Sequence, residues 1–192
     1  MRDAALTLFA ERGYHGTSMK DIAEAVGMRA PSLYNHVGAK QELLVEIIEA
    51  TLVDLQRLHE EAVGSTRDVG DGLRRAVEAH VRYHARHPRE VRVGNRDLPA
   101  LEPANRDRVI GMRRRYARSW QALLQRGADL GRFDLPDARL ASYAILEMGI
   151  GVATWFRPDG PLSEDVVAYH YGEMALRLAG AGRALSPADG RG

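Results

Sequence analysis

The sequence contains no cysteine, and this absence excludes three kinds of chemistry at once. Disulfide bonds, thiolate metal sites and a cysteine nucleophile all require that residue. Long apolar runs are also missing, since none approaches the roughly 20 residues that a membrane-spanning helix needs. The first helical stretch, residues 1–12, carries charged side chains and is not typical of a signal peptide. We therefore expect a cytoplasmic protein without a membrane partner.

The motifs of common enzymes are absent as well: the chain has no Gly-x-Ser-x-Gly, P-loop or His-Glu-x-x-His pattern. Gly149 and Gly151 begin like a dinucleotide fingerprint, but no strand is predicted before them, which favours helix packing. The histidines at positions 80, 84 and 87 could place three imidazoles on one helical face for a metal ion. No carboxylate lies among them, so we interpret them as pocket or surface histidines. The sequence predicts no enzyme, no metal site and no bound cofactor.

Lysine is scarce, with only Lys20 and Lys40 present, and the charge is distributed unevenly. Residues 1–64 hold six basic and ten acidic side chains, a net charge of −4. Residues 65–132 hold sixteen arginines and eight acidic side chains, a net charge of +8. Binding of nucleic acid by the N-terminal part would therefore depend on a few well-placed cations and on helix ends.

Helical periodicity dominates the chain and no strand pattern is convincing, which predicts an all-α fold of about nine helices. Three short helices are expected in the first 36 residues. Longer segments are expected at about 40–62, 68–86, 105–127, 137–156 and 163–178, with a short helix after Pro88. Residues 183–192 are small and polar, which is typical of a flexible tail.

The second and third short helices have the elements of a helix-turn-helix. Ser18 and Asp21 have the spacing of a capping box, and Gly27 supplies a positive-φ residue for a tight turn. The next helix is expected to begin near Arg29, with Pro31 in its first turn, where a missing N–H costs nothing. In such a unit the second helix lies in the major groove of DNA.

The expected outward face of residues 29–36 suits contact with base edges. If Leu33 faces the core, a rotation of 100° per residue turns Ser32, Tyr34 and Asn35 away from it. These side chains are small, polar or aromatic, and they can reach the groove without bulk. Lys40 combines a cation with the free N–H groups at the start of the next helix, which predicts a phosphate contact. Ser18 with Lys20 predicts a second one.

The run LFAERGYHGTSMKDIA at residues 8–23 closely resembles the start of the tetracycline-repressor (TetR) family. The same holds for VGM at 26–28 followed by APSLYNHVGAK at 30–40. The resemblance implies a homodimer on a palindromic operator in double-stranded DNA. It also implies a helix-turn-helix domain at 1–45, an effector-binding and dimerisation domain at 46–182, and the tail at 183–192.

The positions that match DNA contacts of the family are Ser18, Lys20, Arg29, Ala30, Ser32, Tyr34, Asn35, His36 and Lys40. Asn35 and Val37 stand where the family often has aromatic residues, so the resemblance does not give the operator sequence. Relatives usually carry a basic segment before the first helix, which here begins at Met1. We expect either one phosphate contact fewer per half-site or further residues upstream.

Three C-terminal segments resemble one branch of the family: HVRYHARHP at 80–88, GRFD at 131–134 and WFRPDGPLS at 155–163. That branch resembles regulators of fatty-acid, aromatic-acid and steroid catabolism, many of which respond to acyl-CoA thioesters. An acyl-CoA needs apolar helix faces and arginines for its phosphates. Residues 105–127 offer seven arginines, which are alternatively an ordinary solvated face. The expected ligand-lining residues are Tyr83, Met112, Tyr116, Trp120, Met148 and Trp155.

Residues 137–178 resemble the dimer interface of the family, in which two apolar helices form a four-helix bundle with their counterparts. Glu147 lies in an apolar run and is expected to be buried, so that it needs a partner. An arginine at the dimer interface is the favoured partner, and a place in the ligand pocket is the alternative.

The sequence thus predicts a dimeric repressor that a small hydrophobic or acyl-CoA-type effector releases from its operator. A helical module that senses a small molecule or a metal without using DNA is the alternative, which the acidic N-terminal part permits. Activation of transcription instead of repression also stays open.

Overall fold

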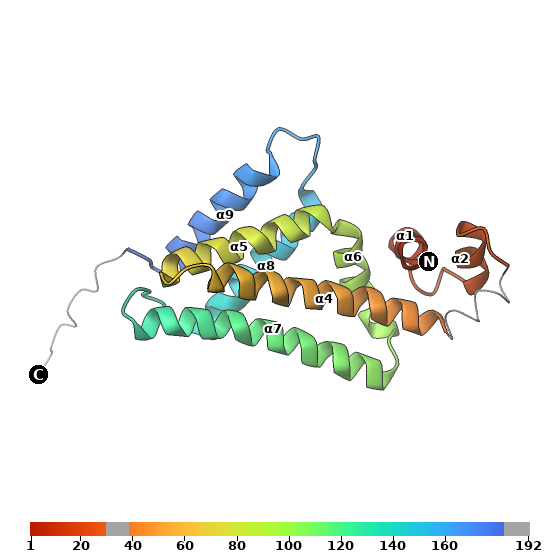
Figure 1. Ribbon diagram of the computed structural model, residues 1–192, viewed down its shortest axis with the longest axis horizontal. Coiled ribbons are helices and arrows are strands. Elements are labelled where there is room, and N and C mark those ends of the chain that lie inside the picture. The colour runs from red at the N-terminus through yellow and green to blue at the C-terminus, as the bar shows by residue number, and fades with distance from the viewer. Residues whose placement is uncertain (30–38, 183–192) are drawn as a thin grey trace, which may run out of the picture. The chain divides into compact units, whose positions relative to one another are not determined.

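The computed structural model describes residues 1–29 and 39–182, and all regular structure in these ranges is helical (Figure 1). The described helices are α1 (Arg2–Arg12), α2 (Met19–Ala25), α4 (Lys40–Gly64), α5 (Val69–Arg86), α6 (Pro88–Arg96), the 3₁₀ helix η1 (Leu98–Ala100), α7 (Pro103–Asp129), α8 (Ala138–Trp155) and α9 (Glu164–Leu178). The all-α prediction is confirmed. The short helix expected at 29–36 falls almost entirely on residues 30–38, outside the described ranges.

The chain forms two compact units that do not follow the order of the sequence. The first unit comprises residues 1–54 and 87–114, and the second comprises residues 55–86 and 115–192. Helices α4 and α7 contribute residues to both units. Each unit has its own cluster of buried apolar side chains. The functional boundary expected at residue 45 stays a prediction.

In the first unit, two short motifs set the ends of the N-terminal helices. α1 ends at Gly13, whose φ of 82° favours glycine. α2 begins at Ser18 with the expected capping box: the Asp21 N–H donates to Ser18 Oγ at 3.1 Å, and the Ser18 N–H donates to Asp21 Oδ2 at 2.7 Å. Gly27, with φ of 69°, makes the predicted turn after α2. Local sequence alone therefore determines where this part of the chain changes direction.

The core of the first unit joins residues that are far apart in sequence. Phe9 and Ile22 from α1 and α2 are fully buried together with Leu44 from α4. Val93 of α6 and Val109 of α7 are equally buried in the same cluster. α6 packs directly against α1 and against η1. The N-terminal helices therefore share one core with residues that begin near position 87.

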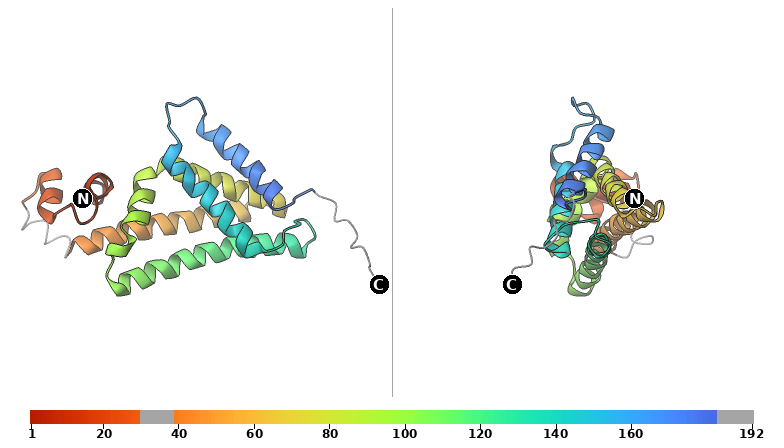
Figure 2. Two further views of the ribbon diagram at one scale, coloured as in Figure 1. Left: turned by 180° about the vertical axis from the view of Figure 1, so that it is seen from behind. Right: turned by 90° about the vertical axis from the view of Figure 1, so that its left-hand side faces the viewer.

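In the second unit, α5 packs along both α8 and α9, as Figure 1 and the left-hand view of Figure 2 show from opposite sides. Leu73, Val77 and Val81 repeat at intervals of four residues along α5 and are fully buried. They pack in one cluster with Trp120 of α7 and Ile145 of α8, both fully buried. Burial of each large side chain contributes roughly 1.5–3 kcal/mol, so this apolar stripe holds the unit together.

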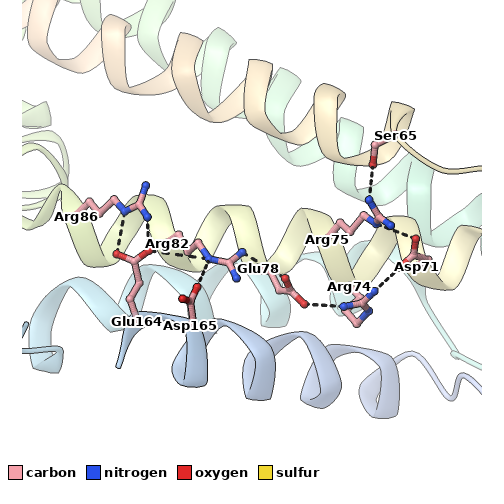
Figure 3. A network of polar contacts seen from close by, with 9 residues as sticks. All are labelled: Ser65, Asp71, Arg74, Arg75, Glu78, Arg82, Arg86, Glu164 and Asp165. Carbon is pink, nitrogen blue, oxygen red and sulfur yellow. Dashed lines mark hydrogen bonds and ion pairs between the residues drawn. The ribbon is translucent and has the colours of Figure 1, made fainter. Parts of the chain in front are cut away.

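α5 and the start of α9 are also joined by charged side chains (Figure 3). Arg86 donates to both oxygens of Glu164, at 2.9 Å and 2.6 Å, and Arg82 donates to Asp165 at 3.1 Å. Both acids lie in the first turn of α9, whose end Ser163 caps through the Val166 N–H at 3.3 Å. Acidic side chains in the first turn interact favourably with the positive end of the helix dipole. These two therefore stabilise α9 and attach it to α5.

Close contact between α5 and α8 depends on a glycine. A methyl group added at Gly149 would lie 2.2 Å from Cδ2 and 2.7 Å from Nε2 of His80. Gly151, two residues further, has open space around it in the single chain. The packing predicted for this glycine pair thus holds within the chain for Gly149. Among the described residues, every helix is too short or too polar to pass through a bilayer.

Candidate functional site

The described part of the helix-turn-helix domain presents three of the predicted DNA-contacting residues to solvent. Ser18 and Lys20, at the start of α2, are exposed, and so is Arg29 after the Gly27 turn. The Lys20 side chain is 78% exposed and lies 3.7 Å from Glu24, one turn on. Five further residues of this set fall outside the described ranges: Ala30, Ser32, Tyr34, Asn35 and His36. The orientation expected for residues 29–36 therefore stays a prediction.

Lys40 has a more internal place than the sequence suggested. Its ammonium group donates to the carbonyl oxygens of Tyr14 at 2.8 Å and of Thr17 at 2.6 Å. It also lies 4.1 Å from the centre of the Tyr14 ring. Burial lowers the pKa of Lys40, and the nearby Asp21 carboxylate opposes part of that shift. Two of its three protons thus tie α4 to the segment between α1 and α2, and one remains for the predicted phosphate contact.

Further hydrogen bonds tighten the same segment. The Thr17 hydroxyl donates to the Gly13 carbonyl at 2.9 Å, and the Gln41 amide donates to the Tyr14 hydroxyl at 3.1 Å. Burial raises the pKa of Tyr14, which keeps its hydroxyl protonated as an acceptor and donor. The start of α2, where Ser18 and Lys20 lie, is thereby fixed relative to α4.

The C-terminal end of α1 is held by α6. Arg96 donates to the carbonyl oxygens of Phe9 and Ala10, which are among the last carbonyls of α1. The guanidinium is held in turn by Asp97, whose Oδ2 accepts from Arg96 at 2.9 Å. The Phe9 carbonyl also accepts from the Gly13 N–H at 2.9 Å, so Arg96 adds a second donor to it and contributes one to Ala10. A side chain from α6 therefore completes α1, which nothing in the local sequence of α1 indicates.

The second unit contains a buried group of aromatic and imidazole side chains. The His80 ring is 2% exposed, and its Nδ1 lies 2.9 Å from the Tyr116 hydroxyl. Its Nε2 lies 3.2 Å from the Leu146 carbonyl, which can only accept. His80 therefore carries its proton on Nε2 and accepts from Tyr116 at Nδ1. Burial lowers the pKa of His80 far below its usual range, so this ring is neutral.

His59 and Trp120 complete this group. Their ring centres lie 4.8 Å apart, and the Trp120 centre lies 6.1 Å from that of Tyr116. Within the described residues, neither nitrogen of His59 has a hydrogen-bond partner, and neither has Nε1 of Trp120. Burial raises the pKa of Tyr116. The Trp120 indole opposes part of this increase because it lies near the Tyr116 hydroxyl, although the two groups do not form a hydrogen bond of ordinary geometry. Burial lowers the pKa of His59 to about 4. We call His59, His80, Tyr116 and Trp120 the histidine cluster.

The six residues predicted to line a ligand site are distributed over different places. Tyr116 and Trp120 lie in the histidine cluster, and Tyr83 and Met148 pack in the same apolar core. Met112 packs in the core of the first unit. Trp155 is 44% exposed near the end of α8, with its ring centre 6.4 Å from that of Tyr171. Four of the six therefore lie in one apolar core, while Met112 belongs to the core of the first unit and Trp155 to the exposed end of α8.

His59 was not among the predicted site residues, although a sequence feature could have indicated it. It continues the apolar positions Leu52 and Leu55 along α4, where a histidine must be buried. The arginines of α7 belong to both units. Arg108 lies 2.6 Å from Glu49, and Arg113 donates to the Gly94 carbonyl, both within the first unit. Arg115 and Arg126 are exposed residues of the second unit.

Comparisons with known proteins agree with this arrangement. Residues 2–47 match the family described as bacterial regulatory proteins of the tetR family. Residues 66–179 match the tetracyclin repressor-like C-terminal domain. The chain belongs to the TetR family. It is accordingly a DNA-binding transcriptional regulator with an N-terminal helix-turn-helix, as the sequence predicted.

Two TetR-family proteins are similar over almost the whole chain. The transcriptional repressor KstR2 of Rhodococcus jostii (strain RHA1) is 31% identical over 185 residues, which cover 91% of this chain and 86% of KstR2. The regulator PfmR of Thermus thermophilus has a crystal structure with a TM-score of 0.84 and 37% identity, covering 92% of this chain and 96% of PfmR.

A second solved structure shares the fold at lower identity. AibR, solved in complex with isovaleryl coenzyme A and operator DNA, has a TM-score of 0.82 and 23% identity. The match covers 94% of this chain and 96% of AibR. The fold of this chain is therefore also that of AibR, which was solved with isovaleryl coenzyme A and operator DNA.

Proposed function

We propose that this regulator is a homodimeric repressor, and that a small apolar effector releases it from a two-fold symmetric operator. Two observations together carry the proposal. The capped start of α2 is exposed in the helix-turn-helix domain, and α8 and α9 expose an apolar face in the single chain. The overall similarity to the KstR2 repressor supports repression over activation. Because the described residues offer binding surfaces and no catalytic constellation, we propose that the protein acts by binding alone.

The DNA contacts belong to the N-terminal residues. Ser18 and Lys20 at the start of α2, together with Arg29, are placed to contact phosphates or bases. The third proton of Lys40 provides a further phosphate contact at the beginning of α4. The predicted base contacts from Ala30, Ser32, Tyr34, Asn35 and His36 complete this set. Such an interface depends on few cations, which fits the acidic balance of residues 1–64.

The dimer interface lies on α8 and α9. Large apolar side chains are exposed along both helices of the single chain: Leu140, Tyr143, Trp155, Val166, Tyr169, Met174 and Leu178. On α8 the exposed positions recur every three or four residues, which marks one helix face. An apolar face of this kind indicates a protein interface. A second copy of the same two helices, arranged with two-fold symmetry, covers both faces at once.

The effector binds in the second unit, at the histidine cluster, whose residues come from α4, α5 and α7. The apolar lining of this unit suits a hydrophobic molecule or the acyl part of an acyl-CoA thioester. The TetR fold accommodates isovaleryl coenzyme A in AibR. The two helix-turn-helix domains of the dimer must have the spacing of the operator half-sites to bind DNA. An effector that prefers a state with another spacing therefore weakens DNA binding.

Footprinting and titration test this function together. The purified protein should protect a palindromic sequence selected from a random DNA library, with two-fold symmetry about its centre. Its affinity should decrease steeply between about 50 and 200 mM salt because phosphate contacts release counterions. A footprint without two-fold symmetry, or an affinity that does not depend on salt, contradicts the proposal. Release by acyl-CoA thioesters, measured on the same DNA, tests the effector class.

A further inference from the structure

The histidine cluster contains buried polar atoms that the described part of the chain does not satisfy. His59 is 5% exposed and Trp120 fully buried, yet both nitrogens of His59 and Nε1 of Trp120 lack hydrogen-bond partners there. Oε1 of Gln56, one turn before His59 on α4, is also buried without a partner among these residues. Each unsatisfied buried polar group destabilises the folded protein. Native proteins satisfy almost all such groups, so this concentration at one place requires an explanation.

The chemistry of these atoms defines what would satisfy them. A neutral imidazole has one N–H donor and one acceptor nitrogen, and an indole has one N–H donor. The centres of the two rings lie 4.8 Å apart, which is within the reach of one small group. A carbonyl oxygen has two lone pairs and can accept from both. The second His59 nitrogen and Gln56 Oε1 are then acceptors for a hydroxyl group or a water molecule.

The charge of the surroundings excludes an ionised group at this place. Among the described residues of the second unit, the buried polar side chains are His59, His80, His84 and Ser142, and no lysine, arginine, aspartate or glutamate is buried with them. His59 and His80 are neutral near pH 7 because burial lowers the pKa of both. A carboxylate would therefore lose its hydration without gaining a counter-charge, at a considerable cost in binding free energy.

We propose that His59 and Trp120 form the polar anchor of the effector site and bind a neutral carbonyl group, such as that of a ketone, ester or thioester, on an otherwise apolar molecule. The inference rests on the proposed effector-dependent function and specifies the chemistry that this site recognises. His80 does not take part directly, because Tyr116 and the Leu146 carbonyl already occupy its two nitrogens. Instead, the His80 bond fixes Tyr116 beside Trp120 and so holds the indole in place.

Binding to the full-length protein can be measured without DNA. The chain has two tryptophans, so a Trp155→Phe background leaves Trp120 as the only indole reporter. The probes are three ketones of different shape, 2-octanone, 4-methylcyclohexanone and acetophenone, each with its carboxylate and hydrocarbon counterpart. We expect saturable fluorescence changes with at least one ketone and at least tenfold weaker binding of its carboxylate. The infrared C=O band of the bound ketone should shift to lower frequency than in hexane.

His59→Phe separates the anchor from general packing. We expect this variant to bind the ketone about tenfold more weakly, to bind the hydrocarbon at least as well, and to lose the infrared shift. Without ligand it should unfold at the same or a higher denaturant concentration, because an unsatisfied polar ring has been replaced by an apolar one. His15→Phe, an exposed change in the first unit, is the matched control and should leave all four readouts unchanged.

The outcomes separate the anchor from the proposed function. If no ketone binds, if carboxylates bind as well as ketones, or if His59→Phe weakens ketone and hydrocarbon binding equally, the anchor is wrong. If ordered water alone satisfies these nitrogens in a crystal grown with the ketone, the anchor is also wrong. Failure of the protein to bind any palindromic DNA contradicts the proposed function, while the ketone titration still decides the anchor.

Discussion

The ammonium group of Lys40 lies 4.1 Å from the centre of the Tyr14 ring and donates to the Tyr14 carbonyl oxygen at 2.8 Å. One residue at the start of α4 thus closes the turn between the first two helices. The other lysine of the chain, Lys20, is exposed on α2 and lies 3.7 Å from Glu24 on the same helix. The two lysines therefore have different roles in the free protein, although both match DNA-contacting positions of the family.

Replacement of Lys40 by Met should reduce both stability and operator affinity. Two carbonyl oxygens lose a charged donor, which should lower the free energy of unfolding by about 2 kcal/mol. Lys20→Met is the matched control and should leave the free energy of unfolding within about 0.5 kcal/mol while reducing affinity and the salt dependence of binding. Urea unfolding and DNA titration of both variants check this. Equal stability of the two variants contradicts an anchoring role for Lys40.

The two glycines of α8 should respond in opposite ways to alanine. Gly149→Ala forces the new methyl group against the His80 ring and breaks the bond from His80 to Leu146, so we expect a loss of about 2–3 kcal/mol. Gly151→Ala meets open space in the single chain and should stabilise the helix by up to about 1 kcal/mol. Unfolding should be measured at equal protein concentration. A Gly149→Ala protein as stable as the parent would contradict the close packing of α5 on α8.

Acidification should destabilise the fold through its buried histidines. Burial lowers the pKa of His59 from 6.5 to about 4, and it lowers that of His80 in the same direction. Between pH 6.5 and about pH 4 the unfolded chain binds a proton at His59 that the folded chain does not bind. The free energy of unfolding therefore decreases as the pH falls from about 7. For His59 the loss should reach about 2 kcal/mol at about pH 5. Below about pH 4 the folded ring also protonates and its contribution to the slope ends.

The His59→Phe variant isolates this contribution. Urea midpoints measured from about pH 8 to pH 5 should decrease less steeply in the variant than in the parent protein. His15→Phe should retain the slope of the parent, because His15 is exposed. Parallel curves for the parent and His59→Phe would show that the His59 ring titrates alike in both states.

A charge placed on the exposed face of α9 should separate the dimer. Tyr169 is 52% exposed, and burying a glutamate there against a second copy would be strongly unfavourable. Tyr169→Glu should therefore sediment as a monomer and bind a palindromic operator at least about 100-fold more weakly, since the second helix-turn-helix domain no longer binds as part of one molecule. Leu130→Glu, an equally exposed apolar site after α7, should remain dimeric. A dimeric Tyr169→Glu protein places the interface elsewhere.

Local motifs of this protein could be read from the sequence, whereas distant contacts could not. The Ser18–Asp21 capping box, the Gly27 turn and the approximate helix bounds depend on a few adjacent residues, and the structure has them as predicted. The hydrogen bonds from Arg96 to α1 join residues 86 and 87 positions apart, and no periodicity in either segment indicates them. The unpaired nitrogens of His59 arise in the same way, because their surroundings come from different helices.

One expectation about the interface is not tested by the single chain. Glu147 was predicted to be buried because apolar residues surround it in sequence, but its side chain is exposed on α8. The helix is apolar on two faces, one packed on α5 and one open to solvent, and sequence alone does not show which face Glu147 occupies. A partner for Glu147 from a second copy stays a prediction.

The hydrogen bonds from Arg96 to the end of α1 bear on how this protein is made. During synthesis the first 54 residues leave the ribosome before α6, although they share one core with it. The end of α1 then lacks the Arg96 guanidinium until α6 has emerged, and residues 55–86, which belong to the other unit, emerge in between. The helix-turn-helix domain therefore cannot complete its core from its own residues. A fragment cut after this domain would lack part of its buried interior. The core of the first unit is complete only when the chain has been translated to about residue 114.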